Sequence, residues 1–317
     1  MVSLVECLLR DCRKLSCLHW PVLVGLFWIA FPVSGVAQSH RAKTCVRAHP
    51  TASATVRGFV FKTYEAANVD DPACLRIYRD GKVVYHLADD EQMYYLGQPA
   101  NAPYKIPVAP NGADLTGDGR PDMIVTAWSG GAHCCFTHLI FELEPKLRLL
   151  ATIDDGDADL SHFEKLGKSR GYSYMTRDIW SYWPASFASS VSHKVILSWS
   201  GERFRLDWDK MRYPPPTPRQ WASALSDVNG ALNDPANARE ALGETLWDTT
   251  LDLIYTDHSD LAWKFVREAN PKALAGDNPS LGEFCLKLKK SAYWPELEPT
   301  LKNAPKECLN AKDRAEK

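Results

Sequence analysis

The sequence lacks the short motifs by which common catalytic sites are recognised. It contains no Gly-x-Ser-x-Gly nucleophile elbow, no His-Glu-x-x-His zinc helix, no dinucleotide-binding glycine fingerprint and no Walker loop. Each of these motifs fixes a nucleophile, a metal ligand or a phosphate cradle in one local geometry, so their absence argues against the enzymes that depend on them. The sequence therefore favours a non-enzymatic protein over an enzyme.

A strong charge of one sign is also missing. The 317 residues carry 37 Lys and Arg against 39 Asp and Glu, a formal net charge of −2. Proteins bind nucleic acid largely through positive charge that neutralises phosphates, so this balance gives no support for a nucleic-acid partner. We expect a protein or glycan partner, whose identity the sequence does not show.

The length exceeds the roughly 100–200 residues of an ordinary domain, which predicts two domains.

Apolar runs are short, and the longest lies near the N-terminus. Basic residues at 10, 13 and 14 precede an apolar run at 21–33, and small residues at 35 and 37 follow it. This order is typical of a secretory signal peptide, and the run is shorter than the roughly 20 residues of a membrane span. We predict a signal peptide at 1–37, cleavage after Ala37, a periplasmic or secreted location, and no transmembrane segment after cleavage.

The cysteine count agrees with export. Nine cysteines are present, and three of them lie within the predicted leader. An even number then remains in an oxidising compartment, which predicts disulfides. The remaining residues are Cys45, Cys74, Cys134, Cys135, Cys285 and Cys308. We expect Cys285 and Cys308 to pair because both lie in the C-terminal region. Two arrangements remain open for the other four cysteines. In the first, Cys134 pairs with Cys135 and Cys45 pairs with Cys74. In the second, Cys134 and Cys135 each pair with a distant cysteine.

The loop Asp114–Asp122 is the most informative segment. It reads Asp-Leu-Thr-Gly-Asp-Gly-Arg-Pro-Asp, with oxygen-bearing side chains at its first, third, fifth and ninth positions and a glycine, Gly119, at its sixth. Ca²⁺ takes six to eight oxygen ligands, and alternate residues of a tight loop can converge on one such ion. The competing interpretation is a plain β-turn whose carboxylates accept hydrogen bonds from backbone N–H groups.

This loop resembles the calcium-binding loop of the FG-GAP and VCBS repeat families, in which a hydrophobic strand follows the acidic residues. The resemblance covers about residues 111–143, and the strand here is 123–128. It implies a structural calcium ion as cofactor. The implied ligands are the side chains of Asp114, Asp118 and Asp122, the carbonyl of Arg120, and Thr116 weakly or not at all. Thr116 stands where the families usually carry Asn or Asp, which lowers the charge of the site.

A second candidate segment is Gly-Gly-Ala-His-Cys-Cys at 130–135. It resembles a segment of exported bacterial proteins that also carry an Asp-rich loop, and this resemblance implies no particular activity. Three interpretations remain open for its cysteines: a disulfide, a soft-metal site with His133 and His138, or redox activity. The disulfide is favoured because an oxidising compartment closes adjacent thiols, and the Cys-x-x-Cys spacing of thioredoxin-like sites is missing.

The residue pattern changes along the chain. Residues 45–208 alternate as strands, with hairpins predicted at 75–85, 136–153 and 194–208. After the proline-rich segment 213–216, a capping box at Thr217 and Gln220 begins the first of four predicted helices. We predict an α+β protein. An antiparallel, β-rich N-terminal domain at 38–212 carries the FG-GAP-like loop, and a small α-helical bundle domain follows at 213–317.

Two further segments receive structural interpretations. The acidic run 154–159 is predicted to be a solvated turn, with a degenerate second metal loop as the alternative. The aromatic run 180–184 is predicted to be buried, with an exposed stacking platform as the alternative.

Together these patterns predict an exported, non-enzymatic calcium-binding protein that acts as a binding or scaffold module in the cell envelope. The alternative is an envelope hydrolase that uses scattered carboxylates and histidines, with Asp122, Asp178 and His133 as participants. A redox protein that uses Cys134 and Cys135 is a further alternative.

Overall fold

The computed structural model describes residues 45, 49–68, 71–89, 91, 93–98, 108–131, 135–158, 160–269, 274, 276 and 278–310. The predicted signal peptide, its cleavage site, His133 and Cys134 lie outside these residues. The chain from Ala42 to Lys317 forms one compact unit. Within the described residues, no helix combines the length and the apolar character needed to cross a membrane.

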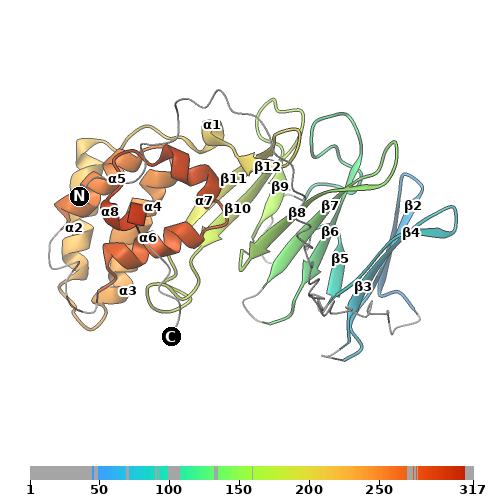
Figure 1. The fold of residues 1–317 in the computed structure, drawn as a ribbon, viewed down its shortest axis with the longest axis horizontal. Coiled ribbons are helices and arrows are strands. Elements are labelled where there is room, and N and C mark those ends of the chain that lie inside the picture. The colour runs from blue at the N-terminus through green and yellow to red at the C-terminus, as the bar shows by residue number, and fades with distance from the viewer. Residues whose placement is uncertain are drawn as a thin grey trace, which may run out of the picture. The chain divides into compact units, whose positions relative to one another are not determined.

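Within the described residues, three four-stranded antiparallel sheets follow one another along the chain (Figure 1). The first sheet contains β1 (Ala52–Val56), β2 (Phe59–Tyr64), β3 (Ala73–Arg79) and β4 (Lys82–Asp89). The second sheet contains β5 (Met93–Leu96), β6 (Asp122–Trp128), β7 (Phe136–Glu142) and β8 (Arg148–Gly156). The third sheet contains β9 (His162–Glu164), β10 (Ser173–Ile179), β11 (Ser192–Trp199) and β12 (Phe204–Leu206). Consecutive strands pair in every sheet, so each sheet is a meander.

The predicted hairpins are confirmed, and local turn chemistry explains the clearest of them. Between β3 and β4, Asp80 and Gly81 have φ values of 51° and 76°. Positive φ values at both central residues define a type I′ turn, which the dipeptide Asp-Gly favours. This turn type is common in hairpins because the twist of its backbone matches the twist of the flanking strands. The pairs β7 with β8 and β11 with β12 also form as predicted.

The second sheet is buried on both faces. Along β6, Met123 and Val125 belong to a hydrophobic cluster with Phe61 of the first sheet, whereas Ile124 belongs to a cluster with Phe163 of the third. Successive side chains of a strand point to opposite faces, so the second sheet lies between the other two (Figure 1). Polar side chains on its face toward the third sheet are consequently enclosed between the two sheets.

Helices follow the third sheet. They are α1 (Trp208–Met211), α2 (Pro218–Ala231), α3 (Ala238–Leu242), α4 (Asp248–Tyr255), α5 (Ser259–Glu268), α6 (Leu281–Lys290), α7 (Trp294–Leu297) and α8 (Lys306–Asn310), with a π-helical turn at Gly243–Trp247 and a 3-10 turn at Glu298–Thr300. The capping box predicted at Thr217 and Gln220 is present. A second capping box, at Ser280 and Glu283, begins α6.

The helices and the third sheet share one hydrophobic core. The cluster that contains Tyr174 and Val195 of the third sheet also contains Trp247, Trp263 and Phe284 of the helical segment. The mixture of helices and antiparallel sheets confirms an α+β protein. The division into separate domains between residues 212 and 213 stays a prediction. The helices that follow residue 213 pack on the third sheet, which precedes it.

Two disulfides join pairs of cysteines that both lie among the described residues. Cys285 pairs with Cys308, as predicted. Cys45 pairs with Cys74, which is the arrangement of the first alternative. Cys135 is also disulfide-bonded. Cys134 lies outside the described residues, so the bridge predicted between adjacent cysteines stays a prediction.

The prediction of a solvated turn at 154–159 is wrong for Asp155. This residue belongs to β8 and is 8% exposed, and its Oδ1 accepts a hydrogen bond from the Thr176 hydroxyl. The alternation of β8 turns it toward the third sheet, which a local acidic pattern does not reveal. The aromatic run at 180–184 is largely buried, as predicted: Trp180 and Trp183 are 4% and 6% exposed, and Tyr182 is exposed.

Candidate functional site

The loop Asp114–Asp122 is folded around the carboxylate of Asp114. Its Oδ1 accepts hydrogen bonds from the backbone N–H groups of Gly117 at 2.6 Å and Asp118 at 3.1 Å, and its Oδ2 accepts one from Gly119 at 2.8 Å. Gly117 and Gly119 have φ values of 81° and 89°, which glycine adopts without the strain of a side chain. The sequence pattern therefore produces a tight acidic loop directly before β6.

A second segment holds the loop in place. The N–H of Tyr172 donates to the Leu115 carbonyl at 2.8 Å. A Cβ atom on Gly171 would lie 2.6 Å from that same oxygen, so the two backbones approach too closely for any larger residue. The loop is thereby fixed against the chain that leads into β10.

Asp122 closes the loop from the first position of β6. It is 1% exposed, and its Oδ2 accepts hydrogen bonds from the N–H groups of Leu115 at 2.8 Å and Thr116 at 3.3 Å. Its Oδ1 and the Thr116 hydroxyl oxygen are buried without a hydrogen-bond partner among the described residues. Burial raises the pKa of the Asp122 carboxyl to about 7, although the two amide donors act to lower it. Two buried oxygens of the predicted ligand set therefore have no donor.

Arginines pair with two other acidic residues near the loop, Asp118 and Glu142. Asp118 accepts a hydrogen bond from the Arg120 N–H at 2.9 Å, and the Arg120 Nε lies 3.4 Å from its second oxygen. The Arg120 Nη1 also pairs with Glu142 of β7 at 2.7 Å, and Arg148 of β8 pairs with Glu142 at 3.2 Å. Local sequence reasoning missed Glu142 and Arg148, because strand pairing places them here.

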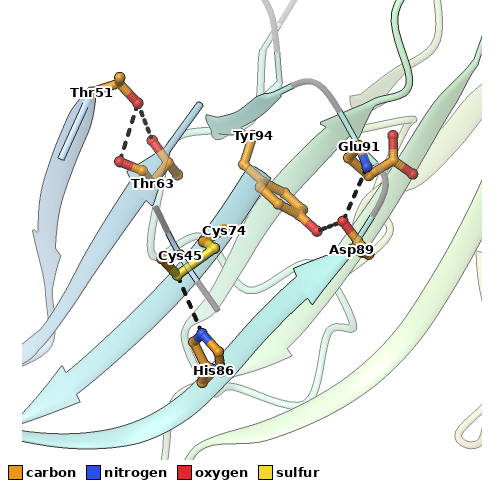
Figure 2. Close-up of a disulfide and its surroundings, with 8 residues drawn as sticks. All are labelled: Cys45, Thr51, Thr63, Cys74, His86, Asp89, Glu91 and Tyr94. Carbon is orange, nitrogen blue, oxygen red and sulfur yellow. Dashed lines mark hydrogen bonds between the residues drawn. A yellow bond between two sulfur atoms is a disulfide. The ribbon is translucent and has the colours of Figure 1, made fainter. Parts of the chain in front are cut away.

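The predicted ligands do not form a gathered cation site. Within the described ranges, one group of His, Cys, Asp and Glu has its ligand atoms within 4.8 Å of one another, and it is Cys45, Cys74 and His86. Figure 2 shows that its two sulfur atoms form a disulfide, with the His86 Nε2 at 3.3 Å from the Cys45 Sγ. The carboxylate oxygens of Asp114, Asp118 and Asp122 do not gather within that distance, so calcium binding would require at least one of these side chains to move.

Other candidate residues from the sequence have different surroundings. The His138 Nδ1 lies 2.8 Å from the Thr126 hydroxyl, and its Nε2 lies 3.8 Å from Asp155, between the second and third sheets. Asp178 is 7% exposed and lines a cavity together with Asp155. His133 and Cys134 lie outside the described residues, so the soft-metal and redox interpretations stay predictions.

A further polar cavity, of about 460 Å³, lies between β10, β11 and α4. It is lined by His193, Asp248 and Asp252, and the His193 Nδ1 is 3.4 Å from an Asp252 oxygen. Burial, with Arg177 nearby, lowers the pKa of His193 to about 4. Burial raises the pKa of Asp248 to about 6. Sequence reasoning missed this site, although shifted pKa values in a cavity are typical of acid–base sites.

Comparison of the chain with protein-family models, with curated proteins and with solved structures finds no match.

Proposed function

We propose that the protein is an exported, non-enzymatic calcium-binding protein that acts as a binding or scaffold module in the cell envelope. Calcium is structural in this proposal and is held by the loop Asp114–Asp122. The observation that carries the proposal is the buried Oδ1 of Asp122, which has no hydrogen-bond partner among the described residues. A cation beside this oxygen would offset the cost of burying the carboxylate, which otherwise favours its protonated form.

The surroundings of Asp122 support an oxygen-rich cation site. The Thr116 hydroxyl oxygen is also buried without a hydrogen-bond partner among the described residues, and the carboxylates of Asp114 and Asp118 would complete the set of side-chain oxygens once they move closer. Hard cations such as Ca²⁺ prefer carboxylate, hydroxyl and carbonyl oxygens, which is the set that this loop offers. The ion would neutralise charge and fix the loop before β6.

The arrangement of sheets is compatible with the FG-GAP resemblance. Propellers are assembled from four-stranded antiparallel sheets that follow one another along the chain. The described residues form three such meanders, fewer than the blades of a complete propeller. We propose that it shares the loop and the sheet unit with those families, and that exposed side chains such as Tyr182, 61% accessible, contribute to contact with a protein or glycan.

A melting experiment with matched variants tests the proposal. Calcium should raise the melting temperature of the wild-type protein and a chelator should reverse the change, because an ion that binds the native state stabilises it by mass action. Asp118→Ala should lose this response. Asp80→Asn is the control, since Asp80 lies in another Asp-Gly turn and its side chain is 90% exposed. Equal responses in both variants, or no response in the wild type, would contradict the proposal.

The cavity at His193 favours a second candidate function, an envelope hydrolase. Between about pH 4 and about pH 6, His193 is neutral and Asp248 keeps its proton, so in that range the pair supplies a proton acceptor and a proton donor. The test is hydrolysis of p-nitrophenyl acetate and of a p-nitrophenyl glycoside, with His193→Gln and the exposed-residue control His49→Gln. Activity lost only in His193→Gln supports this function. Activity no greater than that of buffer removes it.

A further inference from the structure

The first sheet has one apolar face and one polar face. Phe61 of β2 and Ile77 of β3 belong to the hydrophobic cluster that the first sheet shares with the second. Their neighbours along the strands, Lys62 and Arg76, are half-buried. Successive side chains of a strand point to opposite faces, so Lys62 and Arg76 lie on the face that is turned away from the second sheet.

Strand pairing aligns basic side chains across this polar face. Lys62 of β2 lies directly opposite Arg76 of β3, and Arg76 lies directly opposite His86 of β4. Neighbouring strands are about 4.8 Å apart, so these three residues form a row about 10 Å long. We call Lys62, Arg76 and His86 the basic row. Ser53 of β1 lies opposite Lys62 and adds a hydroxyl group at one end of the row.

Within the described part of the chain, no carboxylate forms an ion pair with the basic row. The Lys62 Nζ lies 5.1 Å from the centre of the Tyr78 ring, and the Arg76 Cζ lies 5.1 Å from the centre of the Tyr64 ring. Figure 2 shows the His86 Nε2 facing the Cys45 Sγ, at 3.3 Å. Aromatic rings attract cations but carry no net charge, and like charges directly opposite each other on a sheet repel. The row therefore lacks a negative partner.

The basic row is open to solvent, and its positive charge affects a neighbouring residue. His86 and Ser53 are exposed, and Lys62 and Arg76 are half-buried. Hydrogen bonding with Tyr64, with Arg76 and Lys62 nearby, lowers the pKa of Tyr78. The ionised form of a phenol is favoured where positive charge and hydrogen-bond donors surround it, so this face stabilises negative charge.

An anionic ligand would supply the missing negative charge. The planar guanidinium of Arg76 matches a carboxylate with two parallel hydrogen bonds, and the Lys62 ammonium adds further donors. The row extends across three strands, which suits a chain with repeated acidic groups better than a single small ion.

The hydroxyl groups beside the row indicate which kind of acidic chain fits. Ser53 and Thr55 are exposed on β1, and their partners Lys62 and Val60 lie on the same polar face. Hydroxyl groups donate and accept hydrogen bonds, as the hydroxyl groups of a sugar do. The chain as a whole has a formal net charge of −2, so a polyanion would be attracted by this local face and not by the overall charge.

We propose that the basic row and Ser53 form a docking site for an anionic glycan, a polysaccharide whose sugar rings carry carboxylates. The carboxylates lie along the row from Lys62 to His86, and ring hydroxyls contact Ser53. The inference rests on the proposed role as a binding module and names the class of its partner. It does not require the calcium loop.

Calorimetric titration in the presence of chelator tests the proposal with three polymers. Polygalacturonate carries carboxylates and hydroxyls, poly-L-glutamate carries carboxylates without hydroxyls, and dextran carries hydroxyls without charge. Polygalacturonate should bind roughly tenfold more tightly than poly-L-glutamate, and its affinity should fall as salt is added. Absence of polygalacturonate binding, or equally tight binding of dextran, poly-L-glutamate or single-stranded DNA, would overturn the proposal.

A pair of double variants with the same change of charge tests the position of the site. Lys62→Gln combined with Arg76→Gln should weaken polygalacturonate binding by roughly tenfold or more. Lys168→Gln combined with Arg219→Gln is the control, because both residues are exposed and lie outside the first sheet. Equal loss of affinity in the two double variants would show attraction to the overall charge and would overturn the docking site.

Single variants of exposed residues keep the test valid if the first double variant does not fold. His86→Gln should weaken polygalacturonate and poly-L-glutamate alike, whereas Ser53→Ala should weaken polygalacturonate alone. Unchanged polygalacturonate affinity in both single variants would overturn the assigned position. Because chelator is present throughout, these results do not depend on the calcium response, and the melting experiment with calcium can fail or succeed separately.

Discussion

The loss of stability with rising pH should disappear when calcium is added, because Asp122 is buried and its Oδ1 has no hydrogen-bond partner among the described residues. The pKa of this carboxyl is raised from 3.8 to about 7. Between these two values the folded state holds a proton that the unfolded state has released. The stabilisation is therefore complete below about pH 4 and is lost as the pH rises through about 7.

The size of the effect follows from the pKa difference. A shift of about three units between 3.8 and about 7 corresponds to about 4 kcal/mol, at about 1.4 kcal/mol for each unit. A bound calcium ion would favour the ionised carboxylate, so the loss of stability with rising pH would disappear. Because the ion binds the deprotonated carboxylate, calcium affinity should rise with pH.

Urea denaturation measures this directly, at about pH 4.5 and about pH 7.5, with chelator and with calcium. Asp248 also has a raised pKa, to about 6, so the contribution of Asp122 is the difference between the wild type and Asp122→Asn. We expect the wild type in chelator to lose more stability with rising pH than this variant. Equal pH dependence in the two proteins, with and without calcium, would refute the reasoning.

Three other changes test the fold around the site and in the helical segment. Gly171→Ala should destabilise the protein by about 1–3 kcal/mol in urea, since its Cβ would meet the Leu115 carbonyl at 2.6 Å; unchanged stability would contradict the close approach. Replacing Cys285 and Cys308 by Ser should cost about 2–4 kcal/mol, measured with the reduced wild type as control. Thr217→Ala should cost about 1 kcal/mol through loss of the capping box, whereas a loss near zero would show that α2 begins without it.

Elements with local signals could be predicted from the sequence. The start of α2 follows from Thr217 and Gln220, and the hairpin between β3 and β4 follows from Asp80 and Gly81, because neighbouring residues make all the necessary interactions. The tight loop around Asp114 belongs to the same class. Whether that loop holds calcium stays a prediction.

Features that depend on long-range pairing could not be predicted. Asp155 is buried because β8 turns it toward Thr176, 21 residues away, and Tyr255 reaches Asp178 across 77 residues. Glu142 lies beside the loop because β7 pairs with β6. Sheet packing thus encloses acidic residues that the local sequence pattern assigns to solvent. The spacing of residues along the sequence does not reveal this packing.

Calorimetric titration of the purified protein with calcium tests the central claim most directly. We expect saturable binding of a single ion, with a dissociation constant of roughly 0.1 to 1 mM, the range of extracellular calcium modules. Asp118→Ala should abolish the heat, and Asp80→Asn should leave it unchanged. Absence of heat in the wild type, or undiminished binding in Asp118→Ala, would contradict the account and leave Asp114–Asp122 as a turn closed by its own backbone hydrogen bonds.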